Sequence, residues 1–296
     1  MKITNFRIQN LKSIADSGMI ALGPVTLLVG KNNVGKSSIL QGIYSMQALG
    51  EVSPADVRKG STSANIEIKL AEIDGPLHWN IPFDSPVASL RYSINANGSQ
   101  QNMMLGDVNG PQAGVNRISS SAPASFIFPF LSGRKVNGYQ ETINQQQSLL
   151  VAPTLTNLVA RVDTLMDQHH PQHEMFMTLV AEVINLKLSA VHSTNGKRVG
   201  MWISSTEAIY LEDMGAGIAQ MLGLIVNICL AEDSLFLIEE LENDIHPEAL
   251  KLLISAIERN RHKNQYVIST HNNIVLRNLG SLEDTKIYEL NSETTR

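Results

Sequence analysis

The chain has 296 residues, of which 43% are hydrophobic and 17% are charged, and its formal net charge is −5. This length suits one large domain or two small ones, and the acidic balance argues against a protein that coats nucleic acid or anionic membranes by bulk charge. The single cysteine, Cys229, cannot form an intramolecular disulfide, and the sequence begins without the apolar stretch of a signal peptide, so we expect a cytoplasmic protein. The most apolar segment, 214–230, is too short to span a bilayer and predicts a buried helix rather than membrane insertion.

The first part of the chain predicts strands with one helix among them. Residues 2–9 alternate between polar and apolar side chains, as a half-buried strand does, and the continuous apolar run 25–29 predicts a central strand covered on both faces. Residues 36–48 have apolar side chains at helical spacing. Short alternating pieces over 64–108 predict an antiparallel meander, and the Gly-, Asn- and Ser-rich stretch 106–123 predicts a mobile loop.

The rest of the chain predicts helices that alternate with strands. Apolar stripes over 155–166 and 176–184 flank a turn, so we expect a helical hairpin inserted into the domain. After short strands beyond residue 186, the pattern predicts a helix at 217–230, a strand at 235–238, a helix at 248–259, a strand at 266–269, a helix at 274–279 and a strand at 286–290. Alternation of strands and helices at both ends of the chain predicts an α/β core on a largely parallel sheet. The expected divisions are an N-terminal lobe at 1–125, a helical insertion at 126–200 and a C-terminal lobe at 201–296.

A phosphate-binding motif begins where the apolar run 25–29 ends. The segment Gly30-Lys31-Asn32-Asn33-Val34-Gly35-Lys36-Ser37 fits the pattern G-x-x-x-x-G-K-[ST] and lies between a predicted strand and a predicted helix, the context that this motif requires. Its glycines let backbone N–H groups turn toward the phosphates, Lys36 would reach the β- and γ-phosphates, and the Ser37 hydroxyl would ligate Mg²⁺. The expected nucleotide contacts are Gly30, Asn32, Asn33, Gly35, Lys36, Ser37 and Ser38.

Polar side chains also follow two of the predicted strands near the C-terminus. Glu239 and Glu240 come directly after the strand at 235–238, and His271 comes shortly after the strand at 266–269. Beside a phosphate loop, one carboxylate can hold the magnesium through water and the other can polarise the attacking water. We assign the first role to Glu239 and the second to Glu240, since adjacent strand residues point to opposite faces. Residues just beyond the ends of parallel strands face the ligand crevice, so His271 is a candidate for contact with the γ-phosphate.

Together, the phosphate loop, the segment 239–247 (EELENDIHP) and Ser269-Thr270-His271 resemble the ABC-type ATPases of the RecF, SMC and OLD (overcoming lysogenisation defect) group. The segment 239–247 is typical of the OLD-like branch, and the similarity is concentrated in residues 1–50 and 205–290. The resemblance implies an ABC-ATPase (P-loop NTPase) core with an antiparallel β subdomain and an inserted helical hairpin. It also implies ATP and Mg²⁺ as cofactors, Glu240 as the catalytic base, 243–246 as the D-loop and His271 as the switch histidine.

The same resemblance requires a signature turn that contacts the ATP held by a second subunit. The candidate is 211–217, in which Gly215 and Gly217 open a predicted helix, although Ala216 stands where the family commonly has serine. The alternative is a pair of glycines needed for helix packing. The family also has a Q-loop glutamine, for which four glutamines near the insertion are candidates. Arg134 could contact phosphate or the opposite subunit; the alternative is an ordinary surface arginine. The four glutamines are Gln140, Gln145, Gln146 and Gln147.

The function that we expect is ATP hydrolysis by an ABC-type homodimer or higher homo-oligomer in DNA-linked genome maintenance or anti-phage defence, with a nuclease or effector protein as partner and DNA as a candidate ligand. One alternative is a nucleotide-dependent scaffold or sensor with little turnover, which Ala216 favours. Another is the ATPase portion of an OLD-like nuclease, because the chain ends too soon after 286–290 to hold a Toprim domain. Two weaker signals are the histidine-rich turn 169–174, read as a polar tip or a zinc site, and the basic cluster 259–263, read as a complement to a helix dipole or a DNA-phosphate contact.

Overall fold

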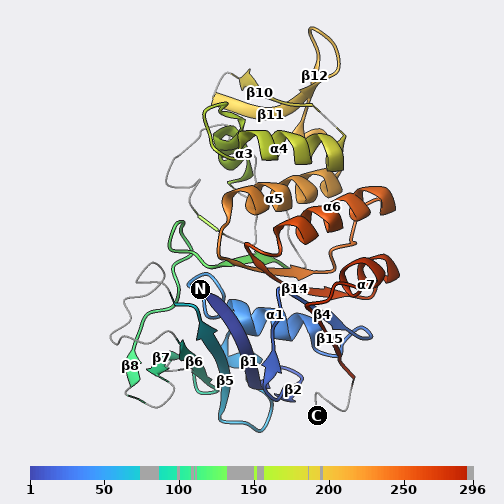
Figure 1. Cartoon of the computed structure of the whole chain (residues 1–296). Helices are drawn as coiled ribbons and strands as arrows, with labels where there is room; N and C mark the ends of the chain where they lie inside the picture. Colours follow the sequence, from blue (N-terminus) through green and yellow to red (C-terminus); the bar gives the residue numbers. More distant parts are fainter. Residues whose placement is uncertain are drawn as a thin grey trace.

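The computed structural model describes residues 1–73, 87–98, 101–107, 110, 112–131, 150–151, 157–185, 187–193 and 196–291. Its elements form stacked layers, with an antiparallel sheet at one end, a parallel sheet in the middle and helices followed by a small sheet at the other end (Figure 1). This arrangement confirms the α/β core with an antiparallel subdomain and an inserted helical hairpin. Within the described ranges, no helix is long and apolar enough to cross a membrane.

The antiparallel sheet contains the strands expected near the N-terminus. Its strand order is β2-β1-β5-β6-β7-β8, and β3 pairs with β1 at Asn5 and Phe6, on the same edge of β1 as β2. The strands are β1 (Lys2–Leu11), β2 (Ile14–Asp16), β3 (Ile20–Ala21), β5 (Ser63–Ala71), β6 (Val87–Asn95), β7 (Gln101–Asp107) and β8 (Gln112–Gly114). The meander is confirmed, because consecutive strands from β5 to β8 pair antiparallel.

The central sheet is parallel throughout and has the order β15-β4-β14-β13-β9. Its strands are β4 (Val25–Val29), β9 (Ile127–Phe130), β13 (Leu235–Glu239), β14 (Gln265–Thr270) and β15 (Thr285–Glu289). Strand β9 lies in this sheet although it falls at the start of the range expected to form the helical insertion. Pro129, which has no N–H to donate, is tolerated there because, among the described strands, β9 is at the edge and pairs with β13 alone.

Helices cover both faces of the parallel sheet. Helix α1 (Lys36–Tyr44) lies between the two large sheets, and the other face carries α5 (Ala216–Leu230), α6 (Pro247–Asn260) and α7 (Asn273–Leu279). Beyond α5 lie α3 (Leu158–Met166), α4 (His173–Leu179) and the π-helical turn η2 (Val180–Ile184) that continues α4. Helices α3 and α4 pack on each other, which confirms the hairpin. The outermost sheet consists of β10 (Leu188–Ser193), β11 (Gly196–Trp202) and β12 (Ala208–Tyr210). Two short 3₁₀ helices of the described residues are η1 (Pro54–Asp56) and η3 (Leu211–Asp213).

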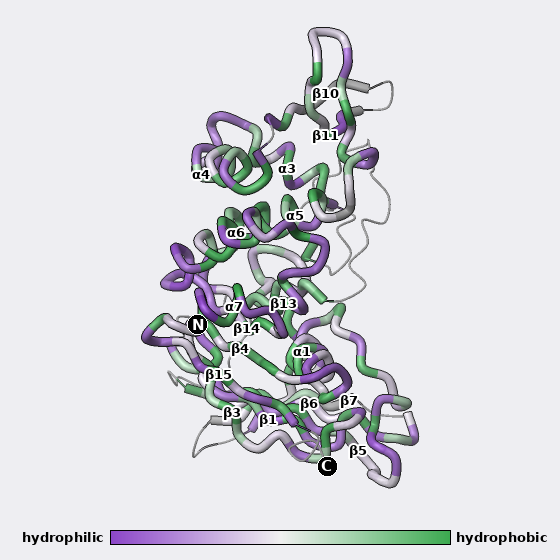
Figure 2. The backbone as a smooth tube through the Cα atoms, turned by 90° about the vertical axis from the view of Figure 1, so that its right-hand side faces the viewer, coloured by the Kyte–Doolittle hydropathy of each residue, from purple (hydrophilic) through white to green (hydrophobic). Residues whose placement is uncertain are grey.

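Two hydrophobic cores lie on opposite sides of the parallel sheet. Successive residues of β13 alternate between them: Leu235 and Leu237 pack with the antiparallel sheet and α1, whereas Phe236 and Ile238 pack with the helices. Helix α5 is apolar around most of its circumference, and Figure 2 shows it beside α6 and below the α3–α4 layer. Because α5 is surrounded by other elements, its apolar sequence produces a buried helix, as predicted.

Two segments differ from their sequence-based predictions. Helix α1 ends at Tyr44 rather than continuing to residue 48, and the Gln47 side chain is fully buried, where it bonds both the N–H and the carbonyl of Ile127 at 2.8 Å. The described part of 106–123 is not a loop throughout, because β8 pairs with β7 and Ile118 is fully buried. Composition in this stretch favours a loop, but the buried Ile118 side chain and its backbone hydrogen bonds with Met46 and Ala48 fix the chain there.

Candidate ATP-binding site

The loop between β4 and α1 curls around the Lys36 side chain. The Lys36 ammonium donates hydrogen bonds to the carbonyls of Gly30 at 2.7 Å and Lys31 at 2.9 Å, and the residue is 7% exposed. Gly30 and Gly35 have φ angles of +150° and +97°, conformations that disfavour a side chain. A Cβ on Gly30 would also lie 2.5 Å from the Leu290 carbonyl oxygen. The glycines of the motif are therefore required by the path of the backbone, and the loop carbonyls hold the lysine ammonium.

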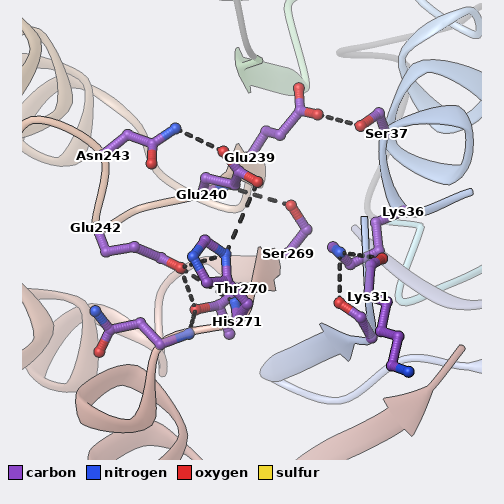
Figure 3. A network of polar contacts seen from close by, with 12 residues as sticks. Lys31, Lys36, Ser37, Glu239, Glu240, Glu242, Asn243, Ser269, Thr270 and His271 are labelled. Atoms are coloured by element: carbon purple, nitrogen blue, oxygen red, sulfur yellow. Dashed lines mark hydrogen bonds and ion pairs between the residues drawn. The ribbon is translucent and has the colours of Figure 1, made fainter. Parts of the chain in front are cut away.

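The hydroxyl of Ser37 donates a hydrogen bond to Oε1 of Glu239, although the two residues are 202 positions apart in sequence (Figure 3). They meet because β4, which leads into the loop, and β13, which ends at Glu239, are parallel strands with their carboxyl ends at the same edge of the sheet. Glu239 is 6% exposed. A carboxylate oxygen and a hydroxyl oxygen are ligands that suit Mg²⁺, which takes few protein ligands and keeps waters and phosphate oxygens for the rest. The donor set therefore fits a magnesium ion shared with a nucleotide.

Glu240 turns away from Glu239 because its backbone is left-handed, with φ +49°. Its N–H donates to the Ser269 carbonyl at 2.9 Å, which ties this turn to the end of β14. Its side chain is 28% exposed, and Oε2 accepts a hydrogen bond from the Asn243 amide at 2.6 Å. The nearest ring nitrogen of His271, Nδ1, lies 3.9 Å from Oε1. The two adjacent carboxylates therefore make separate sets of contacts.

A pocket of about 480 Å³ opens between the loop and these acids. Its lining residues are Lys12, Ser13, Asn32, Asn33, Gly35, Lys36, Ser37, Ser38, Glu239, Glu240 and Ser269. Eight of these were expected from the sequence. Gly30 was also expected, and its carbonyl accepts a hydrogen bond from the Lys36 ammonium. His271 lies beside the pocket, where its ring is next to the Glu240 carboxylate.

Sequence reasoning assigned no contact to three of the lining residues: Ser269 of β14, and Lys12 and Ser13, which occupy the turn between β1 and β2. The Lys12 ammonium lies 3.5 Å from Asp56 Oδ1 and also donates to the Gln41 side chain. The turn belongs to no motif, and it reaches the pocket only because β1 packs over α1. A left-handed φ of +50° at Lys12 marks a tight turn but does not indicate a ligand site from sequence alone.

The two glycines of the proposed signature turn have different environments. Gly215 precedes α5 with an ordinary φ of −59°, and a Cβ there would meet nothing within 4 Å. A Cβ on Gly217 would lie 2.2 Å from the Asp244 carbonyl oxygen, so α5 and the segment after β13 approach each other too closely for a side chain. Helix packing therefore accounts for Gly217, whereas packing places no demand on Gly215. Neither glycine is among the residues that line the pocket of the same chain.

The weaker sequence signals have local explanations in the structure. Nδ1 of His170 accepts from the Gln172 N–H at 3.1 Å, and Nδ1 of His173 lies 2.9 Å from the Leu165 carbonyl. Across the described part of the chain, no group of three or more His, Cys, Asp or Glu side chains is arranged to hold a metal ion.

In the basic cluster, Arg259 pairs with Glu182 at 2.9 Å and Lys263 with Glu232 at 3.4 Å. These contacts offset part of the cluster's charge. Arg134 and the four Q-loop candidates, Gln140, Gln145, Gln146 and Gln147, lie outside the described residues.

Comparisons with known proteins agree with this fold. The family described as "AAA ATPase domain" matches residues 1–82, and the family described as "AAA domain, putative AbiEii toxin, Type IV TA system" matches residues 131–277. No curated protein matches the sequence.

Several solved structures of SMC heads superpose over nearly the whole chain. An SMC head bound to the C-terminal winged-helix domain of ScpA has a TM-score of 0.69 and 16% identity, and the alignment covers 94% of this chain and 92% of that chain. A head with an extended coiled coil, bound to the C-terminal domain of ScpA from Pyrococcus furiosus, has a TM-score of 0.65, 13% identity and coverages of 93% and 91%. The SMC head of Thermotoga maritima has a TM-score of 0.52, 14% identity and coverages of 94% and 92%.

At these identities the structures establish the fold, and the two families establish the kind of domain. They confirm the resemblance to ABC-type ATPases without distinguishing the OLD-like branch. The chain therefore contains two segments, 1–82 and 131–277, that match ATPase-domain families of the AAA group, and it has the ABC-type P-loop fold of an SMC head.

Proposed function

We propose that this protein hydrolyses ATP in the pocket between the β4–α1 loop and the ends of β13 and β14, and that two subunits associate around the bound nucleotide. The observation that carries the proposal is the contact of Ser37 with Glu239 beside an already enclosed Lys36 ammonium. Lys36, Ser37, Glu239 and Glu240 all line this pocket, which supports a site with a cation for the phosphates, two oxygens for magnesium and a second carboxylate. Nucleotide hydrolysis needs these groups to be positioned beforehand.

Each side chain has a separate task in this proposal. Lys36 exchanges its hydrogen bonds with the loop carbonyls for contacts with the β- and γ-phosphates, and the loop N–H groups bind the remaining phosphate oxygens. Ser37 and Glu239 would hold Mg²⁺, which supplies neutralising charge to the phosphates. Glu240 orients the attacking water and accepts its proton, while Asn243 holds one carboxylate oxygen and leaves the other for this task. His271 would contact the γ-phosphate from the end of β14.

Association of two subunits is supported by the position of Gly215. This residue begins α5 with its Cα facing open space, and packing within the chain does not require a glycine there. A helix N-terminus without a side chain in the way can approach a phosphate of a second subunit's nucleotide, with Gly217 maintaining the position of the helix. The α3–α4 hairpin is the proposed dimerisation arm.

For the biological role we propose DNA-linked genome maintenance or anti-phage defence in the cytoplasm, with a nuclease or effector protein as partner. The description of the second matching family as a toxin of a toxin–antitoxin system supports the defence role. The SMC heads that were solved in complex with ScpA show that this fold can carry a protein partner.

A scaffold or sensor with little turnover is the second candidate function. It is favoured by Ala216, which gives the start of α5 no hydroxyl to bind the γ-phosphate in trans. ATP hydrolysis measured with and without DNA separates the two. A scaffold binds ATP and associates but stays slow under both conditions, whereas the proposed ATPase turns over.

The proposal is tested with Glu240→Gln and Lys36→Ala, and with Glu283→Gln as a matched change at an exposed carboxylate. We expect Glu240→Gln to lower kcat by about 10²–10⁴-fold while ATP binding persists and an ATP-bound dimer accumulates in light-scattering measurements. Lys36→Ala should lose ATP binding, and the control should match the wild type. Unchanged hydrolysis in Glu240→Gln would show that Glu240 is not the base.

A further inference from the structure

The side chain of Glu242 is buried beneath the turn that carries His271. It belongs to the segment between β13 and α6 and is 6% exposed. Its Oε1 accepts two hydrogen bonds from the neighbouring turn, one from the Thr270 hydroxyl at 2.8 Å and one from the His271 backbone N–H at 3.1 Å (Figure 3). One carboxylate oxygen therefore ties the segment after β13 to the end of β14.

The imidazole of His271 lies against the same oxygen. Its Nδ1 is 3.4 Å from Glu242 Oε1 and 3.9 Å from Glu240 Oε1. The His271 side chain is 57% exposed, so packing alone restricts it little. An exposed side chain keeps most of its rotamer freedom unless polar contacts fix it. The carboxylates of Glu240 and Glu242 are the polar groups that the described residues place beside Nδ1.

The turn is fixed on the far side of His271 as well. The Thr270 hydroxyl, which donates to Glu242, also accepts from the Asn272 N–H at 3.0 Å. The Asn272 side chain in turn caps α7 by accepting from the Ile274 N–H at 2.7 Å. The backbone of His271 is thus held between two anchored neighbours, and Glu242 is the group on which these contacts converge.

Fold stability does not by itself account for a glutamate at this position. Glu242 Oε2 is buried and has no hydrogen-bond partner among the described residues. Burying an incompletely bonded carboxylate is unfavourable, and an uncharged side chain of similar size avoids that cost. The side chain is therefore better explained by the contacts that its other oxygen, Oε1, makes with the turn and with the imidazole.

We propose that Glu242 is a positioning residue that anchors the Thr270–His271 turn and holds the His271 ring beside Glu240. The inference rests on the proposed function, in which Glu240 is the base and His271 contacts the γ-phosphate. Its consequence is that the relative position of base and histidine is set by one buried carboxylate before the nucleotide arrives. Loss of this anchor should lower turnover more than it lowers nucleotide affinity.

The anchor itself is tested without any nucleotide, by amide hydrogen exchange at His271 measured by NMR. Glu242→Ala removes the acceptor of this N–H, so its exchange should quicken by about tenfold or more. Glu242→Gln retains a carbonyl oxygen that can accept both bonds, so its exchange rate should stay near that of the wild type. This second variant also covers the case in which the alanine variant does not fold. Unchanged exchange in a folded Glu242→Ala protein would overturn the proposal.

The link to turnover is tested by a double-mutant cycle on ATP hydrolysis. We expect Glu242→Ala to lower kcat by about tenfold with KM for ATP within about threefold, and to have less than about a twofold effect in the His271→Ala background. The exposed-carboxylate variant Glu283→Gln is the control. An equal loss in both backgrounds would overturn the proposal, because Glu242 would then act on something other than His271. If the wild type hydrolyses no ATP, the proposed function is wrong, while the exchange measurement still decides whether Glu242 anchors the turn.

Discussion

The close approach of α5 to the segment after β13 leads to a sharp prediction at Gly217. An alanine Cβ at this position would lie 2.2 Å from the Asp244 carbonyl oxygen and 3.3 Å from its carbonyl carbon. The obstacle is backbone, which cannot rotate away as the end of a flexible side chain can. Asp244 itself has a left-handed φ of +61°, so its turn has few alternative conformations. Gly217→Ala must therefore displace either α5 or this turn.

The expected cost is that of overpacking in an otherwise well-packed region, about 1–3 kcal/mol of unfolding free energy. Gly215→Ala is a matched control two residues away: its φ of −59° suits alanine, and a Cβ there meets nothing within 4 Å. We expect its unfolding free energy to stay within about 0.5 kcal/mol of the wild type. The pair of variants thus separates a packing glycine from one that packing does not require.

Both free energies can be measured by urea denaturation followed by circular dichroism. If Gly217→Ala is as stable as the wild type, the reasoning from the close approach is wrong. Activity separates the two positions further, because a Gly215→Ala protein that is fully stable but hydrolyses ATP slowly would support contact with the nucleotide of a second subunit. Unchanged hydrolysis in that variant would argue against the trans contact.

Two further predictions concern the cores. Phe236 is fully buried and stacks between Phe128 and Tyr266, with ring centroids 5.2 and 5.0 Å away, so Phe236→Ala should cost about 3–5 kcal/mol in urea denaturation. Leu252→Ala, at a position on α6 that is 41% exposed, should cost less than about 0.5 kcal/mol, and equal losses in the two variants would contradict the assigned core. Burial raises the pKa of the Cys229 thiol to about 12, so at pH 8 a thiol reagent should label the unfolded protein stoichiometrically and the native protein hardly at all. Rapid labelling of the native protein would show that the α5 layer opens readily.

The strands that lead into the candidate site were predictable from sequence. The run 25–29 and the apolar strand before Glu239 are identified by their hydrophobic patterns without tertiary information, and the structure confirms both strands. The glycine-rich segment 30–37 is identified by its motif. Contacts between segments distant in sequence were not predictable. Nothing near Lys12 indicates that its turn will line the pocket, and nothing near Gly217 indicates which backbone it approaches.

Strand β9 and Glu242 illustrate the same limit. The apolar run around Pro129 contains a residue that normally argues against a strand, and only its edge position beside β13 makes a strand compatible with it. Glu242 lies in a segment of four acidic residues between 239 and 244, where sequence alone suggests solvated charge. Its burial depends on the turn after β14, which is 28 residues away in sequence.

The geometry also explains why the two ends of the chain act as one unit. Leu28 of β4, Leu237 of β13 and Val267 of β14 belong to the same hydrophobic core as the antiparallel sheet. In the parallel sheet, β14 lies between β4 and β13 and pairs with both. It therefore holds the phosphate loop after β4 and the acidic end of β13 at a fixed spacing. The same strand leads directly into His271. A change in the position of β14 would therefore move the histidine relative to both halves of the site. Because Glu242 bonds Thr270 and His271 at the end of this strand, such a change would also reach the segment leading to α6.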